Sequence, residues 1–128
     1  LKVLYRADML REAPPPADVD ALLAEQHLRH SAIDYARRLI EGCCAERDAI
    51  DAIITATLDH WDLARLAAID RVILRMAAYE IVREKELPAG VIINEAIELA
   101  KKYSTDKSGP FVNGILDRIR ATHRGEAR

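Results

Sequence analysis

The sequence has 128 residues, of which 50% are hydrophobic, 31% are charged and 5% are aromatic, and its formal net charge is −2. A chain of this length can bury one sizeable core, which argues against a multidomain enzyme. Many alanine, leucine, isoleucine, arginine and glutamate residues beside few aromatic, glycine and proline residues favour helices over sheets.

The first sixty residues are expected to form several short helices. Apolar residues at helical spacing predict a helix over residues 1–11, which the three prolines at 14–16 end. Asp18 can cap a short helix that runs to about residue 28, and Ser31 can cap the next helix. We favour a break near residues 44–47, between that helix and an isoleucine-rich run that ends at Leu58, although no proline or glycine marks it.

The second half shows a sharper helical period. We expect one helix to end near Glu84, where Leu87-Pro88 follows, and two more over about 89–103 and 109–123. The positions expected to be buried are Ile69, Val72, Ile73, Met76, Ala77, Ile92, Ala96, Leu99, Ala100, Tyr103, Val112, Ile115, Leu116 and Ile119.

No strand-like alternation intervenes, so we predict an all-α fold of six or seven helices in two packed three-helix bundles. Residues 1–60 would form an N-terminal subdomain and residues 61–124 a C-terminal subdomain, with a tail over 125–128, and together they would make one compact domain. The proline-rich linker separates only the first helix and is not a domain boundary.

Motifs for catalysis and cofactor binding are missing from the sequence, which has no P-loop, no dinucleotide fingerprint and no Gly-x-Ser-x-Gly elbow. His27 and His30 have the spacing of two metal ligands, but two ligands do not make a site. Cys43 and Cys44 are interpreted as core or half-buried thiols rather than nucleophiles. Glu80 continues an apolar stripe, and a carboxylate paired with an arginine or a backbone donor is favoured over a general acid or base. We expect a non-enzymatic, cytoplasmic protein without a metal, a cofactor or a membrane span.

Charge is distributed unevenly along the chain. Residues 1–60 carry a net charge of −4, residues 61–100 a net charge of −2 and residues 101–128 a net charge of +4. The basic C-terminal segment could provide an anion-binding face, or it could simply be solvated.

Three ordered segments of the second half resemble the NusB family. The first begins at Trp61-Asp-Leu-Ala-Arg-Leu and continues through Ile69-Asp-Arg-Val-Ile-Leu-Arg-Met-Ala-Ala-Tyr-Glu80. The second is Ile93-Asn-Glu-Ala-Ile-Glu-Leu-Ala-Lys-Lys-Tyr103, and the third, the most diagnostic, is Phe111-Val-Asn-Gly-Ile-Leu-Asp117. The first half is similar only at Leu4-Tyr5 and around residues 35–42.

This resemblance implies a transcription antitermination factor that binds single-stranded boxA-type RNA. Its implied partners are the small-subunit ribosomal protein NusE and the transcription elongation complex, in support of ribosomal RNA transcription, and a homodimer is also possible in this family. The arginine-rich stretch with which the family's first helix normally begins has no counterpart before Leu1, so weaker RNA binding is expected. Two alternatives stay open: the RNA-binding domain of a ribosomal RNA cytosine methyltransferase, and a helical adaptor that binds only protein.

Candidate RNA-binding residues on the first helix are Lys2, Tyr5 and Arg6. Lys2 and Arg6 are one helical turn apart, and Tyr5 could stack on a base or pack inward, of which inward packing is favoured.

Further candidates surround the start of the last predicted helix. Lys107 and the free amides of a helix N-terminus suit a phosphate, and Phe111 could stack on a base or belong to the core. Asn113, about 200° around the helix from Phe111, could hydrogen-bond RNA or the preceding helix. Gly114 is expected where another helix approaches closely.

The resemblance places the candidate partner-binding residues on the helix after Trp61. Asp70, Arg71 and Arg75 are expected to project from its polar side and to contact NusE. A solvated face with pairs inside one helix is the alternative.

Overall fold

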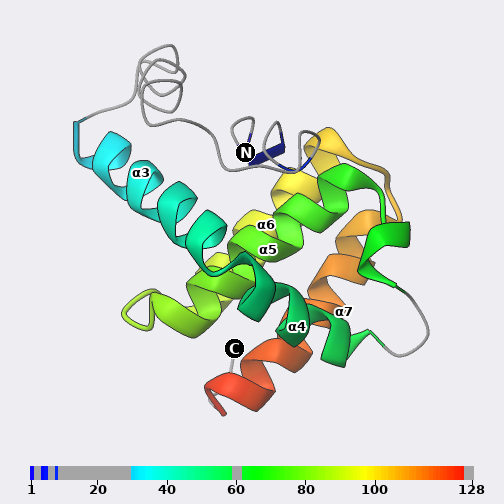
Figure 1. The fold of residues 1–128 in the computed structure, drawn as a ribbon. Coiled ribbons are helices and arrows are strands. Elements are labelled where there is room, and N and C mark those ends of the chain that lie inside the picture. The colour runs from blue at the N-terminus through cyan, green and yellow to red at the C-terminus, as the bar shows by residue number, and fades with distance from the viewer. Residues whose placement is uncertain (2–3, 6–7, 9–29, 59–61, 126–128) are drawn as a thin grey trace.

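A computed structural model describes residues 1, 4–5, 8, 30–58 and 62–125, and Figure 1 shows their arrangement. Within these ranges the chain forms only helices, which confirms the predicted all-α class. They are α3 (His30–Ala45), α4 (Arg47–Thr57), the short 3-10 helix η1 (Leu63–Arg65), α5 (Ala68–Arg83), α6 (Ala89–Tyr103) and α7 (Ser108–His123). Of the first predicted helix, Leu1, Leu4, Tyr5 and Asp8 are described, and the last three are helical. We call the segment that carries these three residues the N-terminal helix. The predicted helix over 18–28 and Trp61 lie outside the described residues.

The predicted break in the first half is confirmed at Glu46. Its backbone angles, φ −106° and ψ 20°, depart from the helical values, and α4 starts at the next residue in a new direction (Figure 1). The amide of Glu46 still donates to the carbonyl of Gly42 at 2.9 Å, so the chain bends without losing that hydrogen bond. The predicted cap at Ser31 is wrong, because α3 already includes His30 and therefore contains Ser31.

Helix α5 is the centre of the molecule, because α3, α4, α6 and α7 all pack against it (Figure 1). Because neighbours lie on several sides of α5, its buried residues do not form the single stripe that we predicted. Ile69 and Met76 are only partly buried, whereas the buried apolar residues are Val72, Ile73, Leu74, Ala77, Ala78, Tyr79, Ile81 and Val82.

Helices α5, α6 and α7 pack pairwise against one another as a three-helix unit. Most of the predicted inward positions of α6 and α7 are buried: Ile92, Ala96, Ala100, Val112, Ile115, Leu116 and Ile119. Leu99 is partly buried, and the prediction for Tyr103 is wrong, since its side chain is 48% exposed. Tyr103 is the last residue of α6. It lies instead beside Lys102, whose Nζ is 5.2 Å from the ring centroid. One hydrophobic cluster includes residues from Leu4 to Ile119, so the predicted subdomains share a core.

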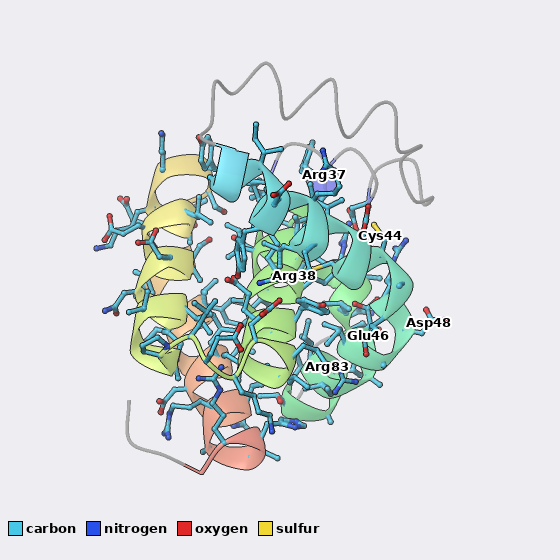
Figure 2. All side chains as sticks on the ribbon, turned by 90° about the vertical axis from the view of Figure 1, so that its left-hand side faces the viewer. Arg37, Arg38, Cys44, Glu46, Asp48 and Arg83 are labelled. Atoms are coloured by element: carbon cyan, nitrogen blue, oxygen red, sulfur yellow. The ribbon has the colours of Figure 1, made fainter. Side chains whose placement is uncertain are left out.

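Ion pairs fasten α3 and the α3–α4 turn to the end of α5 (Figure 2). Arg38 Nε donates to Glu84 Oε1 at 2.9 Å, and Arg83 Nη2 lies 2.7 Å from Glu46 Oε1. Arg38 and Arg83 are 58% and 48% exposed, so solvent screening limits what these pairs add to stability.

Arg124 adds further contacts at this same end of α5. After α7 it returns to the C-terminus of α5, where its guanidinium donates to the carbonyls of Ile81 at 2.9 Å, Glu84 at 3.0 Å and Leu87 at 2.6 Å. Helix C-termini leave carbonyls without partners inside the helix, and Arg124 satisfies them here. The last residues of the described chain therefore fix the α5–α6 connection.

None of the helices in the described ranges has the length and apolar character that crossing a lipid bilayer requires.

Candidate nucleic-acid interface

The turn between α6 and α7 is held by a small group of hydroxyls. The Ser108 amide donates to the Thr105 carbonyl at 3.0 Å, and the Ser108 hydroxyl lies 2.9 Å from that of Ser104 and 3.1 Å from that of Thr105. Short polar side chains of this kind are suited to turns at helix starts because they bond nearby backbone and hydroxyl groups. The result is a rigid start for α7.

Asp70 of α5 lies beneath this turn. Its side chain accepts a hydrogen bond from the Ser108 hydroxyl at 3.1 Å, and only 9% of the residue is exposed. The prediction that Asp70 projects from the polar side of α5 is therefore wrong, because α7 covers that position. A carboxylate at a helix N-terminus is favoured by the helix dipole. Asp70 already places a negative charge at this helix N-terminus, so a phosphate would be repelled from the amides of the turn. Lys107 is therefore the better group to bind a phosphate here.

Lys107, Phe111 and Asn113 all lie along the start of α7, but they do not share one side of it. Lys107 is exposed immediately before the helix, and Phe111 is partly buried against the core, one turn further on. Asn113 is also partly exposed, on a different side of the helix. A cation beside a partly accessible ring can hold one nucleotide by its phosphate and its base. The RNA contacts themselves stay a prediction.

Sequence reasoning missed a basic and aromatic group next to this turn, at the end of α6. Lys101, Lys102 and Tyr103 are exposed. The Lys101 side chain lies over the start of α7, because a Cβ on Gly109 would be 3.8 Å from its Cγ. The signal was the Lys-Lys-Tyr run itself, but helical periodicity placed Tyr103 inside. We call Lys101, Lys102, Tyr103 and Lys107 the α6–α7 turn group.

Gly114 does not mark a close helix approach, which corrects our expectation. A Cβ there would meet nothing within 4 Å. The close approach occurs at Gly42 of α3, where a Cβ would overlap the ring and hydroxyl of Tyr79.

On the N-terminal helix, the described candidate is Tyr5. Leu4 packs in the core, whereas Tyr5 is 39% exposed, so the favoured inward packing of Tyr5 is wrong. Successive helix positions point about 100° apart, which lets one residue enter the core and the next face outward. Lys2 and Arg6 lie outside the described residues.

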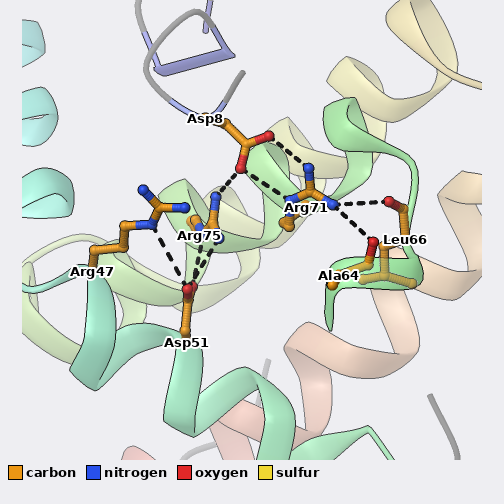
Figure 3. Close-up of polar contacts among 7 residues, drawn as sticks. All are labelled: Asp8, Arg47, Asp51, Ala64, Leu66, Arg71 and Arg75. Atoms are coloured by element: carbon orange, nitrogen blue, oxygen red, sulfur yellow. Dashed lines mark hydrogen bonds and ion pairs between the residues drawn. The ribbon is translucent and has the colours of Figure 1, made fainter. Parts of the chain in front are cut away.

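Arg71 and Arg75 take part in contacts between helices (Figure 3). Arg71 binds Asp8 through Nε at 3.0 Å and Nη2 at 2.7 Å. Arg75 binds Asp51 of α4 through Nε at 2.7 Å and Nη2 at 3.0 Å, and its Nη1 also donates to Asp8. We call these four residues the Asp8–Arg75 clamp.

Both arginine side chains of the clamp are mostly enclosed, at 16% and 12% exposed. The expectation that they project from the polar side of α5 is wrong, and so is the alternative of pairs inside one helix, because their partners come from other segments. Their contact with NusE stays a prediction. Burial raises the pKa of the Asp8 carboxyl, but the hydrogen bonds and charges of Arg71 and Arg75 lower it more, so that its pKa lies below the ordinary 3.8. Asp8 is thus held as a carboxylate that ties the N-terminal helix to α5.

The Glu80 carboxylate has a hydrogen-bond partner, as the sequence analysis favoured, but the partner is a tyrosine and not an arginine or a backbone donor. It accepts a hydrogen bond from the Tyr35 hydroxyl of α3. Burial raises the pKa of Glu80 above its ordinary value, and the bond from Tyr35 offsets only part of that effect.

Cys43 is buried and Cys44 is half-buried, as predicted, and burial raises the pKa of the Cys43 thiol to about 12. A thiol with this pKa is a poor nucleophile at neutral pH.

Over the described ranges, no three His, Cys, Asp or Glu residues are grouped so as to hold a metal ion. The side chain of His30, like His27, lies outside what is described. Within the described ranges, the site that the helices form is a basic turn with accessible aromatic rings, which is typical of a protein that binds nucleic acid.

A model of the NusB family matches residues 1–121. A transcription antitermination protein NusB of a Thermotoga species is 51% identical over 92 residues, which cover 72% of this chain and 65% of the relative's length. The solved structure of T. maritima NusB superposes with a TM-score of 0.84 at 41% identity, covering 95% of this chain and 85% of that one. A structure of the antitermination factors NusB and NusE with double-stranded RNA gives a TM-score of 0.82 at 30% identity, covering 94% and 89%. The chain belongs to the NusB family.

Proposed function

We propose that this protein is a non-enzymatic transcription antitermination factor that binds single-stranded boxA-type RNA together with the ribosomal protein NusE, and so supports transcription of ribosomal RNA in the cytoplasm. The observation that carries the proposal is the likeness in fold to a chain in the solved structure of NusB and NusE with double-stranded RNA. The transcription elongation complex would then be the larger partner.

The α6–α7 turn group supports the RNA part of this proposal. Its three exposed lysines can contact phosphates, and Tyr103 with the accessible part of Phe111 can stack on bases. Bases are free for stacking in a single strand, whereas a duplex hides their faces. The chemistry of the turn therefore favours single-stranded RNA.

For the protein partner, we propose the surface around Arg71 and Arg75, where the N-terminal helix and α4 meet α5. These arginines act by holding α4 and the N-terminal helix in position, because the clamp occupies most of their hydrogen-bonding capacity. Asp70 is not part of this surface, since α7 covers it. A homodimer is the competing use of the same face.

The test is a fluorescence-anisotropy titration of a short boxA-type RNA and a scrambled RNA, over a series of salt concentrations, with and without NusE. We expect tighter binding of the boxA-type RNA, a further gain with NusE, and affinity that falls with salt. Equal binding of both RNAs with no effect of NusE would overturn the proposal. Binding of NusE without any RNA binding would identify a protein-only adaptor.

Two variants locate the interface. Lys107→Ala should reduce the salt slope by about 1 for both RNAs, while Lys85→Ala, an exposed lysine between α5 and α6, should leave it unchanged. Phe111→Leu keeps an apolar side chain against the core but removes the aromatic face, and we expect a loss of about 1–3 kcal/mol in binding. Unchanged binding by both variants would move the interface away from this turn.

A further inference from the structure

A hollow of about 510 Å³ opens beside the Asp8–Arg75 clamp, between the N-terminal helix, α4, η1 and α5. Its polar lining consists of Asp8, Arg47, Asp51, Thr55, Arg71 and Arg75. Three arginines and two aspartates give this lining a formal excess of one positive charge. An anion would meet a favourable potential there.

The two aspartates are already engaged by two of the arginines. Arg71 holds both oxygens of Asp8, and Arg75 holds both oxygens of Asp51 while also contacting Asp8 (Figure 3). These paired contacts fix the guanidinium groups in one orientation and neutralise the carboxylates. The positive charge that remains belongs to Arg47.

Arg47, the first residue of α4, has no comparable partner. Its Nε lies 3.9 Å from Asp51 Oδ2, which is too long for a hydrogen bond, and its side chain is 34% exposed (Figure 3). Thr55 lies two turns further along the same face of α4 and is also exposed. Among the residues that the structure describes, the side chains of Arg47 and Thr55 form no hydrogen bond, although both line the hollow.

We propose that this hollow is a phosphate-binding site, in which Arg47 and Thr55 contact the phosphate and Arg75, held in place by Asp8 and Asp51, forms the wall behind them. A guanidinium presents a planar fork of N–H donors that matches two phosphate oxygens, and a hydroxyl can donate to a third. The clamp keeps the inner wall rigid before the anion arrives. The phosphate is either free inorganic phosphate or a phosphate of a nucleic-acid backbone, and the site does not require that the RNA proposed above is the ligand.

The experiment is an NMR titration of the ¹⁵N-labelled full chain with inorganic phosphate at constant ionic strength, with chloride as the reference anion. We expect saturable shifts at Arg47, Thr55 and Arg75 that chloride does not produce. Arg47→Gln should weaken phosphate binding about tenfold, because it removes a charge-assisted contact. Thr55→Val should weaken it by a smaller factor.

Arg65→Gln is the matched control. Arg65 forms a similar long ion pair, 3.9 Å from Asp62, but is 72% exposed and does not line the hollow. Its phosphate affinity should equal that of the wild type, and thermal melts should show all three variants folded. Shifts no larger than those with chloride, or equal affinity in the Arg47→Gln and Arg65→Gln proteins, would overturn the proposal.

A competition step identifies the source of the phosphate. Displacement of inorganic phosphate by a short single-stranded RNA of mixed sequence identifies a backbone phosphate as the ligand, and retention of phosphate alongside RNA identifies free phosphate. If boxA-type RNA fails to bind at all while phosphate still binds, the function proposed above fails and this site stands.

Discussion

Gly42 and Gly114 both lie within helices, but they affect the stability of the fold in opposite ways. Gly42 lies where the Tyr79 side chain of α5 passes against α3, so a Cβ would require the buried tyrosine to move. Gly114 has open space around it and keeps only the conformational freedom that makes glycine unfavourable within a helix.

We therefore expect Gly42→Ala to lower the free energy of unfolding by about 1–3 kcal/mol through overpacking. Gly114→Ala should raise the free energy of unfolding by about 0.5–1 kcal/mol. Urea unfolding of both variants beside the wild type measures the difference. A stabilising Gly42→Ala would show that Tyr79 does not occupy the place described.

Glu80 should make stability depend on pH. Because burial raises its pKa in the folded state above the ordinary 4.5, ionising it costs free energy that the unfolded chain does not pay. This penalty is absent below pH 4.5, and it grows as the pH rises through the raised pKa. Glu80→Gln keeps an acceptor for Tyr35 without the charge.

The free energy of unfolding of Glu80→Gln, relative to wild type, should therefore increase between pH 4.5 and neutral pH. Urea titrations at several pH values test this. A constant difference across that range would mean that Glu80 is no harder to ionise in the folded protein than in the unfolded one. The Glu41→Gln protein, altered at an exposed position of α3, provides the comparison.

The spacing of residues along the sequence predicts which side chains are buried better than it predicts their polar partners. Burial of Cys43 follows from its place on the apolar stripe of α3, and it was predictable. The Tyr35 partner of Glu80 was not predictable, because the two residues are 45 positions apart and no local spacing relates them. The same applies to Arg71 and Arg75, whose partners lie on other elements.

At the scale of elements, the Asp8–Arg75 clamp decides where the N-terminal helix lies. Asp8→Asn should lower the free energy of unfolding by about 3 kcal/mol, because it leaves the enclosed Arg71 without a carboxylate and leaves Arg75 with Asp51 alone. Hydrogen exchange should increase at Leu4, Tyr5 and Asp8 before it increases in α5, α6 or α7.

The control is Asp34→Asn, whose exposed carboxylate lies 3.4 Å from Arg37 on the same helix and should matter little. Asp8 also contributes to acid stability. Since its pKa is lowered on folding, the stabilisation is present above pH 3.8 and is lost as the pH falls through the lowered pKa. An Asp8→Asn protein as stable as the Asp34→Asn protein would show that the clamp does not hold the N-terminal helix.

Helix boundaries were predictable where the chain carries explicit stops. Pro88 and the Ser-Gly-Pro sequence at 108–110 located α6 and α7 to within a residue. The sides that each helix buries were less predictable. A single apolar stripe describes a helix with neighbours on one side, whereas α5 has neighbours all round. The prediction for Tyr103 was wrong because too few neighbours cover it: α6 ends at this residue, and its ring lies beside Lys102.

For the whole molecule, the proposed mechanism is mutual assistance between two ligands. If NusE raises RNA affinity by some factor, then RNA must raise NusE affinity by the same factor, typically about 5–150-fold. Calorimetric titrations in both orders measure the two factors. Unequal factors would show that the three components do not form the single complex that we propose.

The sequence by itself determined the all-helical class, the positions of α6 and α7, and the family, because helical period, prolines and short ordered motifs are local properties of the chain. Only the tertiary structure decided that Asp70 is covered, that Arg71 and Arg75 hold segments together, and that Tyr5 and Tyr103 are exposed. Each of these depends on which distant helix packs against a residue, and spacing along one helix does not contain that information.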